Sequence, residues 1–396
     1  MAIRGRWSLF VSLLVLGQLL PPAPAHAAIG GGANGPSTLR PVTGRRVGLG
    51  VVLSTSDGGQ IFGWDIDEGG TDGVLASAQD VPKGVRISMQ TFDQTTGAIV
   101  STFARDSGPR SSYGVDGVFA GDVALVTHYV VPRRSIYAKR LYEVMNPVTG
   151  EEFTGSWTPP VNDFDVLQDG DDQSTTTSVL YGIELHRDDD PALVVSDIAA
   201  DTSTLIELDS NVYRDGTTVM AQDTATNQAV LASSNGAVGG PPPLNSIVTL
   251  RNGRITTWAG LNLGPYGAGF VNGIAVDSGT GIAATTTELN AQVEFYDLAR
   301  RTGFAVQLPG TGPTSQLNSG TEVTVDSRHH LFLVADPFYA PTAGSAIVVY
   351  DEQGNVVEAI PGFHFSFTPG RIAVNPQTRT GWADGPGVNQ LQQFFY

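Results

Sequence analysis

The chain contains no cysteine among its 396 residues. This absence excludes disulfide bonds, a thiolate nucleophile and a lipid-modified N-terminal cysteine. A protein that folds outside the cytoplasm without disulfides depends on its apolar core alone. A large closed β-sheet structure meets this need, because the fraction of surface that folding buries rises with size.

Basic residues are also scarce. The 22 lysines and arginines face 39 aspartates and glutamates, which leaves a net charge of −17. Binding to nucleic acid needs a basic surface, so we expect no nucleic-acid partner. Anionic membrane surfaces are disfavoured for the same reason. The acidity is typical of a soluble surface, with cation binding as the alternative.

Several catalytic motifs are absent from the sequence. It has no Gly-x-Ser-x-Gly elbow, no His-Glu-x-x-His helix, no phosphate-binding loop and no dinucleotide fingerprint. His329 and His330 are adjacent, and neighbours on a strand point to opposite faces. We therefore do not expect these two histidines to bind one metal ion together, and their position at a predicted turn favours exposure to solvent.

The N-terminal segment has the pattern of a signal peptide. Arg4 and Arg6 precede an apolar run from residue 7 to residue 20, and Ala25–Ala27 has the small-x-small form of a cleavage site. We expect cleavage after Ala27 and no membrane span in the mature chain; an uncleaved anchor is the alternative. The sequence thus divides into a signal peptide (1–27), a Gly- and Pro-rich disordered leader (28–44) and one β-sheet domain (45–396).

Two features recur along that domain. Ile274–Asp277 is echoed by Val323–Asp326 and Ile372–Asn375, whose starts lie 49 residues apart. Out of phase with them, polar turns, five of which contain glycine, separate short Val-, Ile-, Thr- and aromatic-rich runs at intervals of about 51 residues. These predicted hairpins are Phe92–Gly97, Met145–Gly150, Ala200–Ser203, Arg251–Gly253, Tyr296–Gly303 and Tyr350–Gly354.

Four short antiparallel strands fit one such period, which is the pattern of a β-propeller blade. We predict an all-β fold: a single propeller of seven four-stranded blades, with six or eight as alternatives. The run 47–53 has no early blade of its own. It is predicted to supply the fourth strand of the last blade, so that pairing of the N- and C-terminal strands closes the ring.

The Ile-Ala-Val-Asp openings and the hairpins that begin with Tyr-Asp, Tyr296–Gly303 and Tyr350–Gly354, resemble bacterial extracytoplasmic propellers of the YVTN/NHL-like kind. The resemblance is architectural and covers most of 47–396, although no diagnostic tetrapeptide repeats in strict form. It implies a secreted or periplasmic location. Propellers of this kind include enzymes, electron-transfer partners and binding scaffolds, so the resemblance does not select a function.

Loops between the second and third strands, and between blades, share one end of the propeller and are the expected binding face. For each candidate ligand-binding residue there, the alternative is a purely structural role, in a loop that is solvated or that packs against itself. Arg133 and Arg134 could clamp an anion, and His186 with Asp188 could bind a divalent cation. Phe338 and Tyr339, beside Asp336, could stack on a sugar or peptide.

Two acidic stretches, 65–72 and 163–172, have the carboxylate density of calcium loops but lack the standard ligand spacing. We predict no cofactor, with a divalent cation such as Ca²⁺ as the alternative. Glu288, Asp336 and Asp384, with Asn290 or Asn389, could instead hold a metal that activates water in the central channel.

Together these observations favour a secreted or periplasmic scaffold that binds a protein, peptide or glycan. The alternative is a metal-dependent, lactonase-like hydrolase or lyase with its site in the channel. A structural protein of the cell envelope is a third interpretation.

Overall fold

The computed structural model describes most of the chain from Arg46 onward. The described residues are 46–82, 84–106, 115–120, 123–130, 139–145, 166–173, 179–185, 191–197, 202–207, 218–223, 225–226, 228–235, 244–251, 254–261, 270–288, 292–309, 322–340, 344–365 and 371–396. The predicted signal peptide and leader lie outside them. The described residues include no helix that is long and apolar enough to cross a membrane.

The first half of the described chain forms three sheets from consecutive antiparallel strands. Many of these strands are short runs with several β-branched or aromatic residues, such as β7 and β4. Two sheets have four strands and one has three. The strands are β2 (Gln60–Ile66), β3 (Asp72–Val81), β4 (Gly84–Asp93) and β5 (Ile99–Asp106); β6 (Val115–Ala120), β7 (Val123–Val130) and β8 (Lys139–Met145); and β9 (Val166–Gln173), β10 (Val179–Leu185), β11 (Pro191–Asp197) and β12 (Thr202–Glu207).

The second half forms four further four-stranded sheets, of which the last takes its fourth strand from the other end of the domain. The strands are β13 (Thr218–Asp223), β14 (Gln228–Asn235), β15 (Leu244–Arg251) and β16 (Arg254–Leu261); β17 (Phe270–Asp277), β18 (Ile282–Glu288), β19 (Gln292–Asp297) and β20 (Thr302–Gln307); β21 (Val323–Asp326), β22 (Leu331–Ala340), β23 (Gly344–Asp351) and β24 (Val356–Phe363); and β25 (Ile372–Asn375), β26 (Thr380–Asp384), β27 (Gln390–Phe395) and β1 (Gly48–Ser54).

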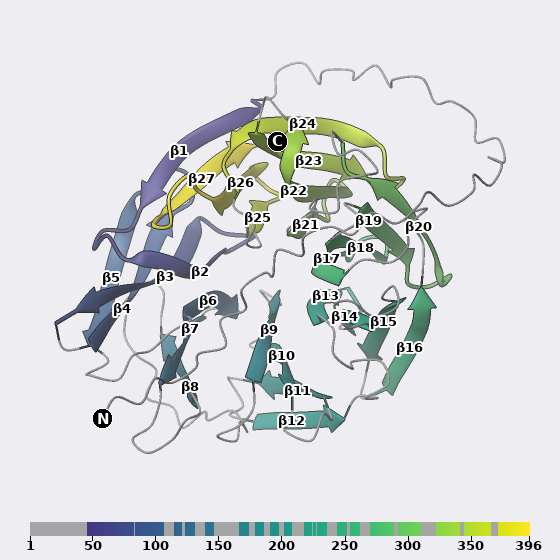
Figure 1. The fold of residues 1–396 in the computed structure, drawn as a ribbon, viewed down its shortest axis with the longest axis horizontal. Coiled ribbons are helices and arrows are strands. Elements are labelled where there is room, and N and C mark those ends of the chain that lie inside the picture. Colours follow the sequence, from purple (N-terminus) through teal and green to yellow (C-terminus); the bar gives the residue numbers. More distant parts are fainter. Residues whose placement is uncertain are drawn as a thin grey trace, which may run out of the picture. The chain divides into compact units, whose positions relative to one another are not determined.

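The pairing of β1 with β27 joins the two ends of the domain, as predicted from the unassigned run 47–53. The two strands run antiparallel, with Leu53 opposite Leu391 and Ser54 opposite Gln390. Figure 1 shows the purple β1 beside the yellow β27. Leu53 is only 2% exposed. This pairing covers the edge of β27 that would otherwise be open to another strand.

The recurring segments of the sequence occupy equivalent places in their sheets. The Ile-Ala-Val-Asp echoes end β17 and form β21 and β25, which are the first strands of three successive sheets. The hairpins predicted near 92, 251, 297 and 351 join the third and fourth strands of four sheets. The hairpin predicted at Met145–Gly150 follows β8 and lies, beyond Met145, outside the described residues.

The first strands of the sheets contact one another in series. β2 contacts β6, and the series continues through β9, β13, β17, β21 and β25, which contacts β2 again. Where side chains are described, apolar groups pack between neighbouring sheets. One cluster joins Trp64 and Leu75 to Trp382 and Leu391, and another joins Leu333 to Phe394. Each sheet therefore buries its faces only when it is stacked between its neighbours.

The number of blades stays a prediction. The described residues form six four-stranded sheets and one three-stranded sheet. Several stretches between them, including residues 146–165, lie outside what the structure describes.

Candidate functional site

The first strand of several sheets ends in an Asp or Asn that shapes the turn to the second strand. Asp277 Oδ1 accepts the amide hydrogen of Gly279 at 2.8 Å. Asp326 Oδ1 accepts that of His329 at 3.0 Å, and Asn375 Oδ1 that of Gln377 at 3.0 Å. These Asx turns explain why the residue type recurs at this place, because the side chain replaces a backbone turn contact.

The residue four positions after this Asp or Asn has a left-handed backbone. Gly281 has φ 73°, His330 has φ 57° and Arg379 has φ 53° in three successive sheets. Non-glycine residues rarely adopt this conformation. Its occurrence at His330 and Arg379 shows that the turn geometry is set by the repeat and not by the individual side chain.

His330 reaches from its own turn to the neighbouring sheet. Its Nδ1 lies 2.7 Å from Oδ2 of Asp277, and the Asp277 side chain is fully buried. A second contact joins the same two turns, since the amide of Ser278 donates to Oγ of Ser327 at 3.3 Å. The ring also packs closely against Gly279, because a Cβ atom added at this glycine would lie only 2.9 Å from Cε1 of His330. These contacts fix the imidazole in place.

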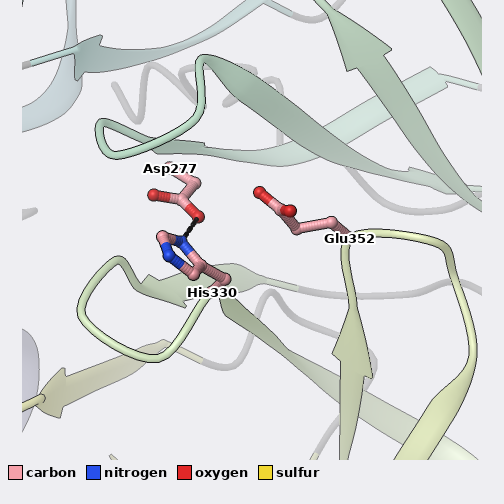
Figure 2. A group of neighbouring side chains, drawn as sticks. All are labelled: Asp277, His330 and Glu352. Carbon is pink, nitrogen blue, oxygen red and sulfur yellow. Dashed lines mark hydrogen bonds and ion pairs between the residues drawn. The ribbon is translucent and has the colours of Figure 1, made fainter.

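Glu352 completes a group of three metal-ligating side chains. It belongs to the turn between β23 and β24, in the same sheet as His330. One ligand atom from each of Asp277, His330 and Glu352 lies within 4.8 Å of the other two. Figure 2 shows the Glu352 carboxylate extending toward the hydrogen-bonded Asp277 and His330.

The electrostatic environment of this group favours positive charge. The hydrogen bond to Asp277 raises the pKa of His330, with further contributions from the charges of Asp277, Glu352 and Asp326 that outweigh its partial burial. The three groups lie at the end of the sheets that carries the first-to-second and third-to-fourth strand turns. This is the end opposite to the expected binding face.

Asp384, one of the predicted metal ligands, has two structural partners. Its Oδ1 accepts a hydrogen bond from Nε1 of Trp64 at 2.8 Å, and its Oδ2 accepts one from the amide of Arg371 at 3.0 Å. Burial raises the pKa of Asp384. The bond to Trp64 joins two neighbouring sheets, a role that the sequence did not predict.

Asp336 and Tyr339 lie on β22 and contribute to the interior. Asp336 is 1% exposed, and Tyr339 packs partly buried against the cluster that contains Tyr350. Burial, with the nearby charge of Asp336, raises the pKa of Tyr350. Among the described side chains, neither Asp336 nor Asp384 belongs to a group of three metal-ligating residues.

The remaining predicted site residues are not described at the level of side chains. Glu288 ends β18 and Phe338 lies on β22, but their side chains lie outside the described part of the structure. Residues outside it altogether are Arg133, Arg134, His186, Asp188 and Asn290. Their predicted roles in anion, cation or ligand binding stay predictions.

The acidic stretch 65–72, for which calcium binding was the alternative, spans the end of β2 and the turn to β3. Asp67 Oδ1 accepts the amide hydrogen of Gly69 at 3.0 Å, and Asp65 Oδ1 accepts that of Ile66 at 2.8 Å. The Asp67 carboxylate therefore forms the turn, and the Asp65 carboxylate accepts a hydrogen bond from the backbone of its own strand. The second stretch, 163–172, begins outside the described residues, and nothing is described of its side chains on β9.

Two exposed apolar side chains mark the end of the sheets that was expected to bind. Val388, in the loop between β26 and β27, is 71% exposed, and Phe62, near the start of β2, is 40% exposed. The amide of Ile61 donates to the carbonyl of Val388 at 2.8 Å, and that of Thr55 to Asn389 at 3.0 Å. The two segments, more than 320 residues apart in sequence, therefore lie side by side.

The repeat spacing of the sequence is a signal for the contact between Asp277 and His330. The 49-residue repeat makes Asp277 equivalent to Asp326 and His330 equivalent to Gly281. An alignment of the repeats would have placed His330 in a turn adjacent to that of Asp277, because successive blades stack turn beside turn.

Comparisons with known proteins identify the fold. No protein-family model matches the chain, and no curated protein sequence matches it. Among solved structures, one of U3-55K has a TM-score of 0.58 at 12% identity and covers 88% of this chain and 98% of its own. The RRP9 WD40 repeats have a TM-score of 0.57 at 11% identity, covering 88% and 99%.

The β-propeller domain of Cps50 (Swd1) from Myceliophteria thermophila has a TM-score of 0.53 at 9% identity, covering 89% of this chain and 100% of its own. Similarities at such low identity concern the fold alone. With the antiparallel sheets described above, they confirm the prediction of an all-β propeller.

Proposed function

We propose that this propeller is a scaffold that binds a protein or peptide through the face marked by Phe62 and Val388. The observation that carries the proposal is the exposure of these two apolar side chains on adjoining segments, 40% and 71%, at the loop end of the sheets. Exposed apolar groups held on a rigid framework are typical of sites that dock a partner.

The framework beneath this face supports the proposal. Asp384 immediately precedes the Val388 loop. One of its carboxylate oxygens accepts a hydrogen bond from the Trp64 side chain, and the other accepts one from the backbone amide of Arg371. The loop is further fixed by backbone hydrogen bonds to Thr55 and Ile61. A surface that is ordered before binding loses less conformational entropy when a partner docks.

The proposal also covers the location of the protein and the kind of propeller to which it is related. The basic n-region, apolar run and Ala25–Ala27 motif support export to the periplasm or beyond the cell, and the acidic composition suits a soluble protein there. Seven blades and kinship with YVTN/NHL-like propellers are also proposed, on the repeat spacing and the strand-opening residues. A glycan ligand would use the same face.

Site-specific photo-crosslinking tests the proposal. A photoreactive amino acid replaces Val388 in one variant and Val100 in a matched control. Val100 is also highly exposed, at 62%, but lies on β5 next to the third-to-fourth strand turn, at the opposite end of its sheet. Both variants are exported in the source cells and irradiated.

We expect a discrete crosslinked protein or peptide from position 388 and none of that mass from position 100. Identical products at both positions would indicate non-specific contact and contradict the assignment of the face. No product at position 388 would contradict the scaffold function.

A further inference from the structure

Three side chains that can bind a metal converge from three turns. Asp277 ends the first strand of one sheet, and His330 and Glu352 lie in two turns of the next. All three are located at the end of the sheets away from Phe62 and Val388. The group is therefore independent of the proposed protein-binding face.

The burial of the Glu352 carboxylate also points to a ligand. Its Oε1 is buried and has no hydrogen-bond partner among the described residues. A buried carboxylate oxygen without a donor is unusual in a folded protein, and a bound ion is one of the physical explanations for it. The neighbouring carboxylate of Asp277 increases the need for a cation, because like charges held close together repel.

The turn itself does not require this combination of residues. In the equivalent turn of the preceding sheet the position of His330 is taken by Gly281, and in the following sheet by Arg379. The position of Glu352, directly after the Asp of the third-to-fourth strand turn, is taken by Leu298 in the preceding sheet. The repeat therefore forms the same turns without histidine or glutamate.

We propose that Asp277, His330 and Glu352 bind a divalent transition-metal ion of the Zn²⁺ type. One imidazole nitrogen and two carboxylate oxygens form a ligand set that suits Zn²⁺, with a fourth position left for water or an external ligand. Ca²⁺ is disfavoured, since it requires six to eight oxygen ligands. His330 is 47% exposed, so the ion has a path from solvent.

The distances are compatible with coordination after a small adjustment. Bonds from Zn²⁺ to nitrogen or oxygen are about 2.0–2.2 Å long, so its ligand atoms lie roughly 3–4 Å apart. The observed group lies within 4.8 Å, and the terminal torsions of Glu352 can close the difference. The ion would replace the hydrogen between Nδ1 of His330 and Oδ2 of Asp277, and a protonated imidazole would release that proton to solvent.

The test is isothermal titration of the untagged, chelator-treated protein with Zn²⁺ and, separately, with Ca²⁺. We expect one Zn²⁺ per chain and no binding of Ca²⁺ at the same concentrations. Glu352→Gln and His330→Ala are expected to weaken Zn²⁺ binding at least tenfold. Glu352→Gln retains the size of the side chain and changes a residue of the turn between β23 and β24, so we expect this variant to fold.

His329→Ala is the matched control. His329 is the adjacent residue of the same turn, but its Nδ1 lies 2.7 Å from Asp326 of its own sheet. This variant should bind Zn²⁺ as the unaltered protein does, and circular dichroism should show that all three variants are folded. Absence of stoichiometric Zn²⁺ binding, or equal loss in His329→Ala and His330→Ala, would overturn the proposal.

Discussion

The hydroxyl of Tyr396 donates a hydrogen bond to Oδ2 of Asp326 at 3.0 Å, and this bond joins two neighbouring sheets. Tyr396 follows β27, and Asp326 ends β21. Both side chains are fully buried. Burial, together with the charge of Asp326, raises the pKa of Tyr396 well above its usual value, so the hydroxyl remains a donor.

Tyr396→Phe is therefore expected to destabilise the protein. It removes one donor from a buried carboxylate, and hydrogen bonds to charged groups contribute about 1.5–3 kcal/mol. Urea denaturation should show a loss of this size in the free energy of unfolding. Tyr350→Phe is the matched control, because the Tyr350 hydroxyl is buried and has no hydrogen-bond partner within the described part of the chain. That variant should be neutral or slightly stabilised, and an equal loss in both would contradict the assigned role of the Tyr396 bond.

The β1–β27 pairing gives a second prediction. Leu53 is 2% exposed and packs between two sheets, whereas its neighbour Val52 is 47% exposed on the opposite face of β1. Leu53→Ala should reduce the free energy of unfolding by about 2–5 kcal/mol, the usual cost of truncating a buried leucine. Thermal and urea denaturation provide the measurement. Val52→Ala should change stability by less than about 1 kcal/mol; comparable effects of both changes would show that β1 does not pack as described.

Glu294 gives a prediction of pH dependence. It is 1% exposed, and Asn245 of the neighbouring sheet donates to its Oε2 at 2.9 Å. The hydroxyl of Tyr296 donates a second hydrogen bond to the same oxygen. Burial raises the pKa of Glu294, and these hydrogen bonds oppose the shift only in part. Folding thus favours the protonated form. This contribution to stability is present below the unfolded-state pKa and is lost as the pH rises through the folded-state pKa.

Glu294→Gln removes this titration while retaining the shape of the side chain. The stability of the variant relative to the unaltered protein should therefore increase as the pH rises from 4.5, the usual pKa of glutamate, to the higher folded-state pKa of Glu294. Urea denaturation across this range measures the difference. Asp297→Asn should show a constant difference there, because hydrogen bonds from the Arg300 backbone and side chain lower the pKa of Asp297. A flat or falling difference for Glu294→Gln would contradict the prediction.

Local sequence patterns predicted much of the fold. The echoes at Ile274, Val323 and Ile372 are first strands, and the glycine-containing hairpins join third and fourth strands, because strand and turn preferences act over a few residues. The pairing of residues 48–54 with β27 followed from counting the strands that remained. Edge protection makes such a closure favourable.

The side-chain groups were harder to predict. Asp384 was a candidate metal ligand in the alternative hydrolase interpretation, and its hydrogen bond to Trp64 joins residues that are 320 positions apart in sequence. Likewise, the contact between His330 and Asp277 depends on the stacking of two sheets and on the left-handed backbone at His330. Neither condition is visible in a local pattern, because each arises from tertiary contacts between strands that belong to different repeats.

The central claim is that the face marked by Phe62 and Val388 binds a protein or peptide. The most direct measurement is isothermal titration of the partner captured at position 388 against three forms: the unaltered protein, Val388→Asp and Val100→Asp. A carboxylate at a desolvated contact is costly, so Val388→Asp should weaken binding at least tenfold, whereas Val100→Asp should leave it unchanged. Equal affinity for the unaltered protein and Val388→Asp would contradict the account.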